Sequence, residues 1–230
     1  PLDGKPHTVF RQMGDTITSF MFKRIQVASA LNAGKCGGSI KDAILILSSA
    51  LSAVASEIWP GEGFDRKRIT EVLAKYSTFT PAPTTISIPM LYQALDPNSE
   101  YKPILRSHFL PQNQGRLLID VDVDKQESEI LKVVAGIPSK TLRQHSYANL
   151  FYTELRSGLV HEYQTTQDAH LMPDTTRTAA ISYANAFSAR HIVFHFDWLI
   201  ETLRSVANNV EPLFESLPLS PPTTWWIEGQ

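Results

Sequence analysis

"SIKDAILILSSALSAVASEIW", residues 39–59, is the stretch of the chain that decides its fold. Apolar side chains recur at every third or fourth position, which is the spacing of one face of an α-helix. These apolar residues are Ile40, Ile44, Leu47, Leu51, Val54 and Ile58. Most other positions are serine or alanine, whose small side chains let a neighbouring helix approach closely. Ser39 and Asp42 have the spacing of a helix-capping box, so the stretch predicts a central helix that begins near residue 40.

Four other segments carry the same helical spacing of apolar residues. They lie at 9–31, 65–76, 140–163 and 197–213. Residues 190–196, "RHIVFHF", alternate between polar and apolar, which indicates a short strand. Together with shorter pieces, these segments amount to about six helices and at most a small β-hairpin. The predicted fold class is therefore mostly α, a helical bundle.

Polar residues mark the expected starts of three of these helices. Asp65, Ser139 and Asp197 are predicted caps, because their side-chain oxygens can accept hydrogen bonds from the first-turn backbone. Gly158 marks a position at which the helix over 140–163 could bend.

The length of 230 residues is enough for one large domain or two small ones, and the 43% hydrophobic content lets the chain bury a sizeable core. Residues 80–89 carry three prolines, which predicts a loop or a short strand there. Residues 214–230 form a proline-rich tail. Trp225 and Trp226 in this tail either anchor it by packing or contact a partner, and the usual burial of tryptophan favours the anchor.

The charge and cysteine content limit the classes of function. A formal net charge of −2 argues against a protein that coats nucleic acid through bulk charge, while a local basic cleft remains open. The single cysteine, Cys36, excludes an internal disulfide framework and fits a reducing compartment. No apolar run approaches the roughly 18 residues of a membrane span, and the first ten residues lack the apolar core of a signal peptide. We therefore expect a cytoplasmic protein with no membrane partner.

Two patterns that resemble metal sites do not meet the requirements of one. Residues 120–124 hold three alternating aspartates, like the start of a calcium-binding loop. Lys125 and Leu131 stand where that loop needs glycine and glutamate. His191 and His195 are four residues apart, but they lie in the predicted strand and have no third ligand nearby. No metal and no cofactor is therefore expected.

"LRSGLVHEY", residues 155–163, holds the candidate chemistry. The guanidinium of Arg156 offers a fork of donors that fits a phosphate. The imidazole of His161 can exchange a proton near neutral pH. The hydroxyl of Tyr163 can donate a hydrogen bond and can be modified. The segment is either a half-buried helix with a satisfied histidine or a site that handles phosphate.

Cleavage of RNA without metal needs a base, an acid and a cation at one phosphate. One arginine and one histidine are too few, whereas two copies that meet across a symmetric dimer would suffice. On a straight helix Arg156 and His161 point about 140° apart, while Arg156 and Tyr163 nearly coincide. The groups therefore converge only through an irregular helix or a dimer cleft. From the residues alone the structural interpretation is favoured, because single arginines and histidines are common on helices.

"RSGLVHEY" also resembles the motif of the HEPN superfamily, in which an arginine is followed by four to six residues and a histidine. The added Glu162-Tyr163 matches the longer form of HEPN toxins that are paired with minimal nucleotidyltransferase antitoxins. Ser157 stands where the family usually has asparagine, aspartate or histidine. The resemblance covers most of 15–210 and implies a single all-α domain over 1–230. Because the chain is longer than the compact HEPN toxins, residues 80–125 are expected to be an insertion relative to them.

The resemblance implies a bacterial, metal-independent endoribonuclease of a toxin–antitoxin or phage-defence system. Arg156 would bind the scissile phosphate, His161 would act as general acid or base, and Tyr163 would support the site or regulate it. Ser157 and Glu162 would have supporting roles. The expected partners are single-stranded RNA or a tRNA loop, a second copy of the chain and a nucleotidyltransferase antitoxin.

Two alternatives remain open. The first is a non-catalytic HEPN module that uses the same groove to hold a nucleotide or a protein partner. The second is a helical scaffold without an active site, which assembles through Trp225, Trp226 and apolar helix faces.

Overall fold

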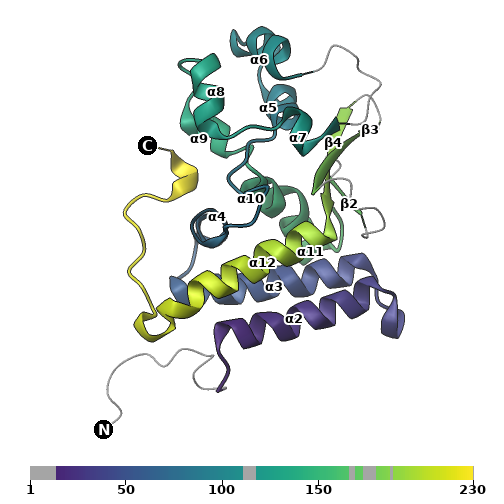
Figure 1. Cartoon of the computed structure of the whole chain (residues 1–230), viewed down its shortest axis with the longest axis vertical. Helices are drawn as coiled ribbons and strands as arrows, with labels where there is room; N and C mark the ends of the chain where they lie inside the picture. The colour runs from purple at the N-terminus through teal and green to yellow at the C-terminus, as the bar shows by residue number, and fades with distance from the viewer. Residues whose placement is uncertain (1–13, 111–117, 166–168, 173–179, 187–188, 230) are drawn as a thin grey trace.

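The computed structural model describes residues 14–110, 118–165, 169–172, 180–186 and 189–229. The chain is mostly helical, with a small sheet along one side (Figure 1). The predicted helix over 9–31 begins outside these residues, and the predicted insertion over 80–125 lies partly outside them. Within the described ranges, no helix has both the length and the apolar character needed to cross a membrane.

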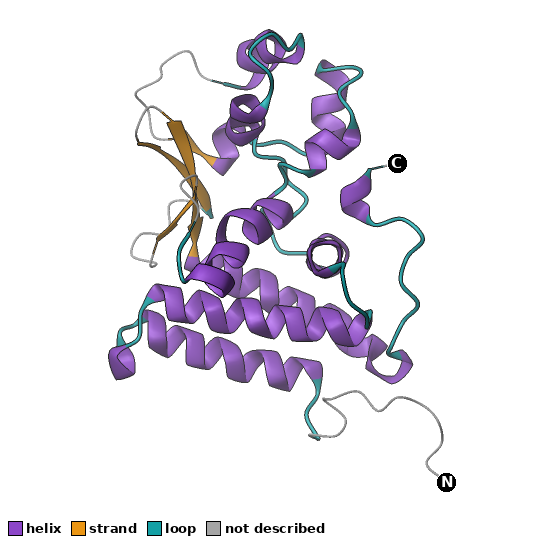
Figure 2. Cartoon of the chain, turned by 180° about the vertical axis from the view of Figure 1, so that it is seen from behind, coloured by secondary structure: helices purple, strands orange, loops and turns teal. Residues whose placement is uncertain are grey.

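Long helices form one end of the molecule. They are α2 (Ile17–Asn32), α3 (Ile40–Ile58), α4 (Asp65–Tyr76) and α12 (Phe196–Val210). In both views α2, α3 and α12 lie side by side, and α4 packs against α3 and α12 (Figures 1 and 2). The predicted helices over 40–58 and 65–76 are confirmed with their bounds. The helix predicted over 197–213 ends at Val210 and continues as a 3₁₀ turn, η3 (Glu211–Ser216).

The apolar stripe of α3 faces the main core, as its spacing predicts. Leu47, Leu51 and Val54 are 0% exposed, and burial of such side chains contributes about 1.5–3 kcal/mol each. The capping box is also present. The backbone N–H of Ser39 donates to Asp42 Oδ2 at 2.8 Å, and the backbone N–H of Asp42 donates to Ser39 Oγ at 3.4 Å. The start of α3 is therefore fixed by its own sequence.

The other three predicted caps are wrong by one or two residues. Phe64, Pro138 and His195 occupy the cap positions, and none of them forms a side-chain cap hydrogen bond. Asp65 and Asp197 instead lie in the first turns of α4 and α12. Each carboxylate there still lies at the positive end of a helix dipole, which favours a negative charge.

Short helices form the opposite end of the molecule (Figure 1). They are α5 (Ile88–Ala94), α6 (Tyr101–Phe109), α7 (Asp120–Val123), α8 (Glu127–Val133) and α9 (Ser139–Arg143). Most of them enclose a second cluster of buried side chains, made of Ile86, Ile88, Leu91, Leu105, Ile130, Val134, Ile137 and Leu142. The expected number of about six helices is thus too low, because helices of nine residues or fewer carry little periodic signal. An insertion at 80–125 stays a prediction.

The helix predicted over 140–163 is interrupted. After α9, the chain forms α10 (Tyr147–Leu150), a π-helical turn η2 (Phe151–Arg156) and α11 (Ser157–Glu162). Ser146 caps α10 by accepting a hydrogen bond from the backbone N–H of Asn149 at 3.3 Å. The irregularity therefore lies at 144–146 and in η2, rather than at Gly158.

A mixed sheet covers one side of the helices (Figure 2). Its strands are β1 (Leu118–Ile119), β2 (Ala169–Met172), β3 (Ile181–Ala186) and β4 (Ala189–His195). The order is β1-β3-β4-β2, in which β2 runs parallel to β4 and the other pairs are antiparallel. The strand predicted at 190–196 is confirmed within one residue, but the sheet is larger than the expected hairpin.

The tail is held by packing, which confirms the anchor interpretation for Trp225. The Trp225 ring is 7% exposed and meets Trp59 edge-on, with ring centroids 5.4 Å apart. Trp226 is half-buried, and the guanidinium of Arg143 lies 5.4 Å from its ring centroid. The tail also forms the short turn η4 (Trp226–Glu228).

Candidate functional site

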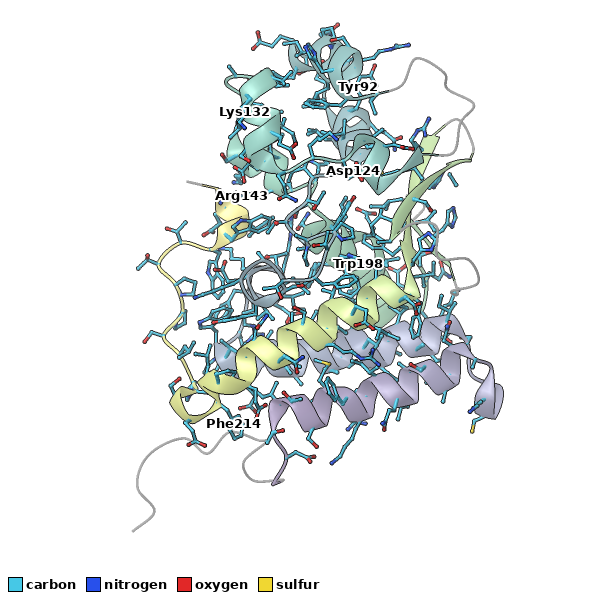
Figure 3. All side chains as sticks on the ribbon, viewed as in Figure 1. Tyr92, Asp124, Lys132, Arg143, Trp198 and Phe214 are labelled. Atoms are coloured by element: carbon cyan, nitrogen blue, oxygen red, sulfur yellow. The ribbon has the colours of Figure 1, made fainter. Side chains whose placement is uncertain are left out.

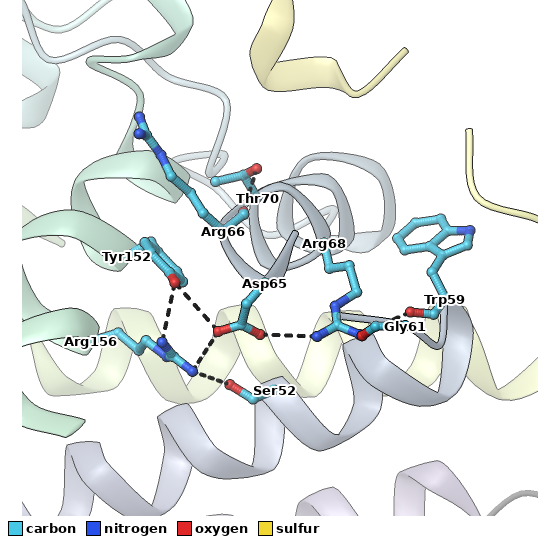
Figure 4. A network of polar contacts seen from close by, with 9 residues as sticks. All are labelled: Ser52, Trp59, Gly61, Asp65, Arg66, Arg68, Thr70, Tyr152 and Arg156. Carbon is cyan, nitrogen blue, oxygen red and sulfur yellow. Dashed lines mark hydrogen bonds and ion pairs between the residues drawn. The ribbon is translucent and has the colours of Figure 1, made fainter. Parts of the chain in front are cut away.

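Arg156 lies at the end of η2 and points into the junction of η2, α3 and α4 (Figure 4). Its Nη2 lies 2.6 Å from Asp65 Oδ2 and donates to Ser52 Oγ at 3.3 Å. Its Nη1 donates to the Tyr152 hydroxyl at 3.2 Å. The side chain is only 12% exposed. The guanidinium is therefore held inside the fold by groups from three different elements.

Asp65 is the centre of this polar cluster, which consists of Ser52, Asp65, Arg68, Tyr152 and Arg156 (Figure 4). Arg68 Nη2 lies 3.4 Å from Asp65 Oδ1, and the Tyr152 hydroxyl donates to Asp65 Oδ2 at 3.4 Å. Burial raises the pKa of Tyr152, so its hydroxyl keeps its proton at neutral pH and remains a donor. One carboxylate thus receives donors from two arginines and a tyrosine.

His161 lies in the last turn of α11 and is exposed. It follows Arg156 by five residues, which on a helix corresponds to a rotation of about 140°. Arg156 reaches inward to Ser52 and Asp65, so the imidazole and the guanidinium occupy different sides of the helix. The structure does not bring the two predicted catalytic groups together within one chain.

Tyr163 joins the end of α11 to the start of α3. Its hydroxyl donates to Asp42 Oδ1 at 2.6 Å and lies 3.4 Å from Ser39 Oγ. This hydrogen bond and those from Ser39 lower the pKa of Asp42. Tyr163 has a φ of 54°, in the left-handed region, and its side chain is 46% exposed. The tyrosine therefore has a structural contact in addition to an accessible ring.

The two residues predicted to support the site differ in exposure. Ser157 is half-buried in the first turn of α11, and Glu162 is exposed in the last. Neither belongs to the polar cluster around Asp65. Gly158, between them, lies under the returning chain, because a Cβ atom there would be 2.3 Å from the carbonyl oxygen of Gln164.

Asp124 forms a second polar centre that the sequence does not reveal (Figure 3). It is 7% exposed and accepts hydrogen bonds from the backbone N–H of Ile88 at 3.0 Å and from the Tyr147 hydroxyl at 2.5 Å. The Tyr183 hydroxyl also bonds to Asp124 and lies 2.7 Å from Ser87 Oγ. Burial, followed by the charge of Asp124, raises the pKa of Tyr183 well above its usual value. Asp124 therefore joins distant segments instead of forming part of a calcium loop.

The histidines of β4 are part of the packed sheet. His191 is 4% exposed and its ring centroid lies 5.1 Å from that of His170. His195 Nε2 lies 3.1 Å from Ser182 Oγ on β3. Among the residues that the structure describes, no three histidine, cysteine, aspartate or glutamate side chains are grouped to hold a metal ion.

The sequence motif does not identify the other four members of the cluster around Arg156, which are Ser52, Asp65, Arg68 and Tyr152. Tyr152 alone has a local signal, since it precedes Arg156 by four residues and so lies on the same helical face.

Comparison of the chain with protein-family models, curated proteins and solved structures found no match.

Proposed function

We propose that this chain is a non-catalytic helical module that binds a phosphate-bearing partner, either a nucleotide or the backbone of an RNA. The observation that supports the proposal is the position of Arg156. Its guanidinium lies among hydroxyl and carboxylate groups, and His161 is on another side of the helix. Arginine provides the two-pronged contact that phosphate prefers. Cleavage would also need an acid and a base at the same phosphate, and the group predicted for this role, His161, does not lie beside Arg156.

The ion pair with Asp65 restrains Arg156, so a phosphate that binds to this arginine must displace the carboxylate, whether or not it is then cleaved. Loss of one partner from a fully buried ion pair costs about 3–5 kcal/mol. The Asp65 side chain is 30% exposed, so solvent screens the pair and the cost falls below that range, to about 1–2 kcal/mol. Because about 1.4 kcal/mol corresponds to a factor of ten, a free Arg156 is a minor state.

A second candidate is a HEPN-like, metal-independent endoribonuclease. The observations that favour it are the Arg156-x4-His161-x-Tyr163 spacing and the exposure of His161. In this candidate two chains pair, so that Arg156 of one and His161 of the other meet at a phosphate of single-stranded RNA or a tRNA loop. A nucleotidyltransferase antitoxin would act on Tyr163. Arg156 would first have to leave Asp65.

One assay distinguishes the two candidate functions. Wild type, His161→Ala and the control His108→Ala are incubated with total RNA in EDTA, and both binding and cleavage are recorded. His108 is a suitable control because it is also exposed on a helix. The proposal predicts that none of the three proteins cleaves the RNA, and that all three bind it if the partner is RNA and not a free nucleotide. Cleavage by the wild type and His108→Ala, but not by His161→Ala, would establish the second candidate instead.

The oligomeric state gives an independent test of the second candidate. Two copies are needed to assemble its catalytic groups, so it requires a dimer. The non-catalytic module has no such requirement. A light-scattering mass near the monomer value of 25.7 kDa at micromolar concentration would exclude the dimer cleft.

A further inference from the structure

The cluster around Asp65 has the composition of an anion site. Asp65 is the first residue of α4, a helix of 12 residues whose cap residue, Phe64, forms no side-chain hydrogen bond. The first N–H groups of such a helix and its dipole favour a negative charge. Arg68 and Arg156 approach the same point from two other directions. The carboxylate of Asp65 therefore occupies a position that suits a phosphate group.

The cluster holds more positive charge and more donors than one carboxylate uses. Two guanidinium groups face the single carboxylate of Asp65. Among the described residues, the buried Nε atoms of Arg68 and Arg156 have no hydrogen-bond partner. Ser52 accepts from Arg156 and so keeps its own proton available. A phosphate has more oxygens than a carboxylate and could use these remaining donors.

The positions of the arginines are fixed independently of Asp65. Arg68 Nη1 donates to the backbone carbonyls of Trp59 at 3.1 Å and Gly61 at 2.9 Å. Arg156 is held by Ser52 and Tyr152. Removal of the carboxylate would therefore leave the donors close to their present places, which is the property of a preorganised site.

Of the three charged side chains in the cluster, that of Asp65 is the most exposed to solvent. The Asp65 side chain is 30% exposed, whereas those of Arg68 and Arg156 are 8% and 12% exposed. An anion that arrives from solution therefore meets Asp65 first, because its side chain is the most exposed of the three.

We infer that this cluster is a phosphate-binding site in which the carboxylate of Asp65 takes the place of the ligand when the site is empty. A phosphate group displaces the carboxylate and binds to Arg156, Arg68, the hydroxyls of Ser52 and Tyr152, and the start of α4. The identity of the ligand as a nucleotide or RNA rests on the proposed function, whereas the anion site itself does not.

The test is calorimetric titration of the purified chain with inorganic phosphate. Asp65→Asn removes the competing charge and keeps the shape of the side chain. Its matched control is Glu201→Gln, which removes the carboxylate of an exposed ion pair with Arg204 at 2.6 Å on α12. We expect Asp65→Asn to bind phosphate at least about tenfold more tightly than the wild type, which is about 1.4 kcal/mol. Glu201→Gln should match the wild type, and Arg156→Ala added to Asp65→Asn should abolish the gain.

Equal phosphate affinity in Asp65→Asn and Glu201→Gln would overturn the inference. Should Asp65→Asn not fold, the wild type decides, by NMR of its arginine Nε–H signals during a phosphate titration. Binding at the cluster moves the Arg156 and Arg68 signals, while the Arg204 signal serves as the internal control. An Arg156 signal that stays in place, or moves no more than that of Arg204, excludes the site.

The same experiments separate this inference from the proposed function. If the wild type binds a nucleotide or RNA while Asp65→Asn gains no affinity for phosphate, the ligand binds elsewhere and only the inference fails. If Asp65→Asn gains phosphate affinity while neither protein binds nucleotide or RNA, the anion site stands and the proposed function fails.

Discussion

Arg156 Nη2 lies 2.6 Å from Asp65 Oδ2, and this ion pair joins the end of η2 to the first turn of α4 across 91 residues of sequence. The pair fixes the direction of the arginine in the Arg156-x4-His161-x-Tyr163 motif. The motif would combine phosphate binding by Arg156 with acid or base catalysis by His161. The pair separates these two roles, because the guanidinium lies inside the fold and His161 is exposed on its surface.

A double-mutant cycle on Asp65 and Arg156 measures the strength of the pair. The variants are Asp65→Asn, Arg156→Ala and the combination, and the free energy of unfolding is measured in urea. We expect a coupling of about 1–2 kcal/mol, because partial burial strengthens the pair relative to a surface one. The exposed pair Glu201–Arg204 is the matched comparison, with an expected coupling of about 0.2–1 kcal/mol. Equal coupling energies in the two pairs would show that Asp65 restrains Arg156 no more than an exposed partner would.

Gly158→Ala tests the close approach of the chain after α11. The new Cβ would lie 2.3 Å from the carbonyl oxygen of Gln164, so the backbone around 158–164 must shift. Overpacking of this kind costs about 1–3 kcal/mol in the free energy of unfolding. Ser157→Ala, at the adjacent half-buried position, is the control and should change stability much less. A Gly158→Ala protein as stable as Ser157→Ala would contradict the described geometry.

Tyr163→Phe tests the link between α11 and α3, and its effect depends on pH. The Tyr163 hydrogen bond lowers the pKa of Asp42 below its ordinary value of 3.8. A carboxylate with a lowered folded-state pKa stabilises the fold above its ordinary pKa and loses that contribution as the pH falls through the folded value. The stability difference between wild type and Tyr163→Phe should therefore be present at pH 7 and shrink below about pH 3.8. A difference that does not change with pH would show that Asp42 is not the partner.

Tyr183→Phe tests the buried centre at Asp124. The Tyr183 hydroxyl bonds to Asp124, and both groups are shielded from water. Without this donor the buried carboxylate is less well satisfied, and we expect a loss of about 1–3 kcal/mol in the free energy of unfolding. Tyr92→Phe, at a half-buried tyrosine of α5, is the control and should change stability by about 0.5 kcal/mol or less. Equal losses of unfolding free energy in the two variants would show that the hydrogen bond from Tyr183 to Asp124 does not stabilise the fold.

The sequence predicts those elements that are determined by residues within one short segment of the chain. The helix α3 could be predicted because its apolar stripe and its capping box lie within one segment. The break at 144–146 could not be predicted, because distant residues cause it. The backbone N–H of Ser87 donates to the carbonyl of His145 at 2.9 Å, and that of Tyr147 donates to the carbonyl of Thr85 at 3.0 Å. These bonds replace the helical ones that a continuous helix would form.

The same limit applies to the candidate site. Arg156, His161 and Tyr163 stand out as a motif because they are close in sequence. The partners that decide what Arg156 does, Ser52 and Asp65, come from other helices. Asp65 had a local explanation as a helix cap, and that explanation conceals its contact with Arg156. A motif therefore identifies a residue, whereas the fold determines the partner of its side chain.

The most direct test of a binding module without catalysis uses a labelled single-stranded RNA in EDTA with wild type and Asp65→Asn, the variant that frees Arg156. Fluorescence anisotropy reports binding, and a gel of the same samples reports cleavage. We predict that Asp65→Asn binds the RNA more tightly than the wild type and that the RNA stays intact in both samples. Cleavage by Asp65→Asn that disappears in Asp65→Asn combined with His161→Ala would contradict the proposal and establish a ribonuclease restrained by its own ion pair.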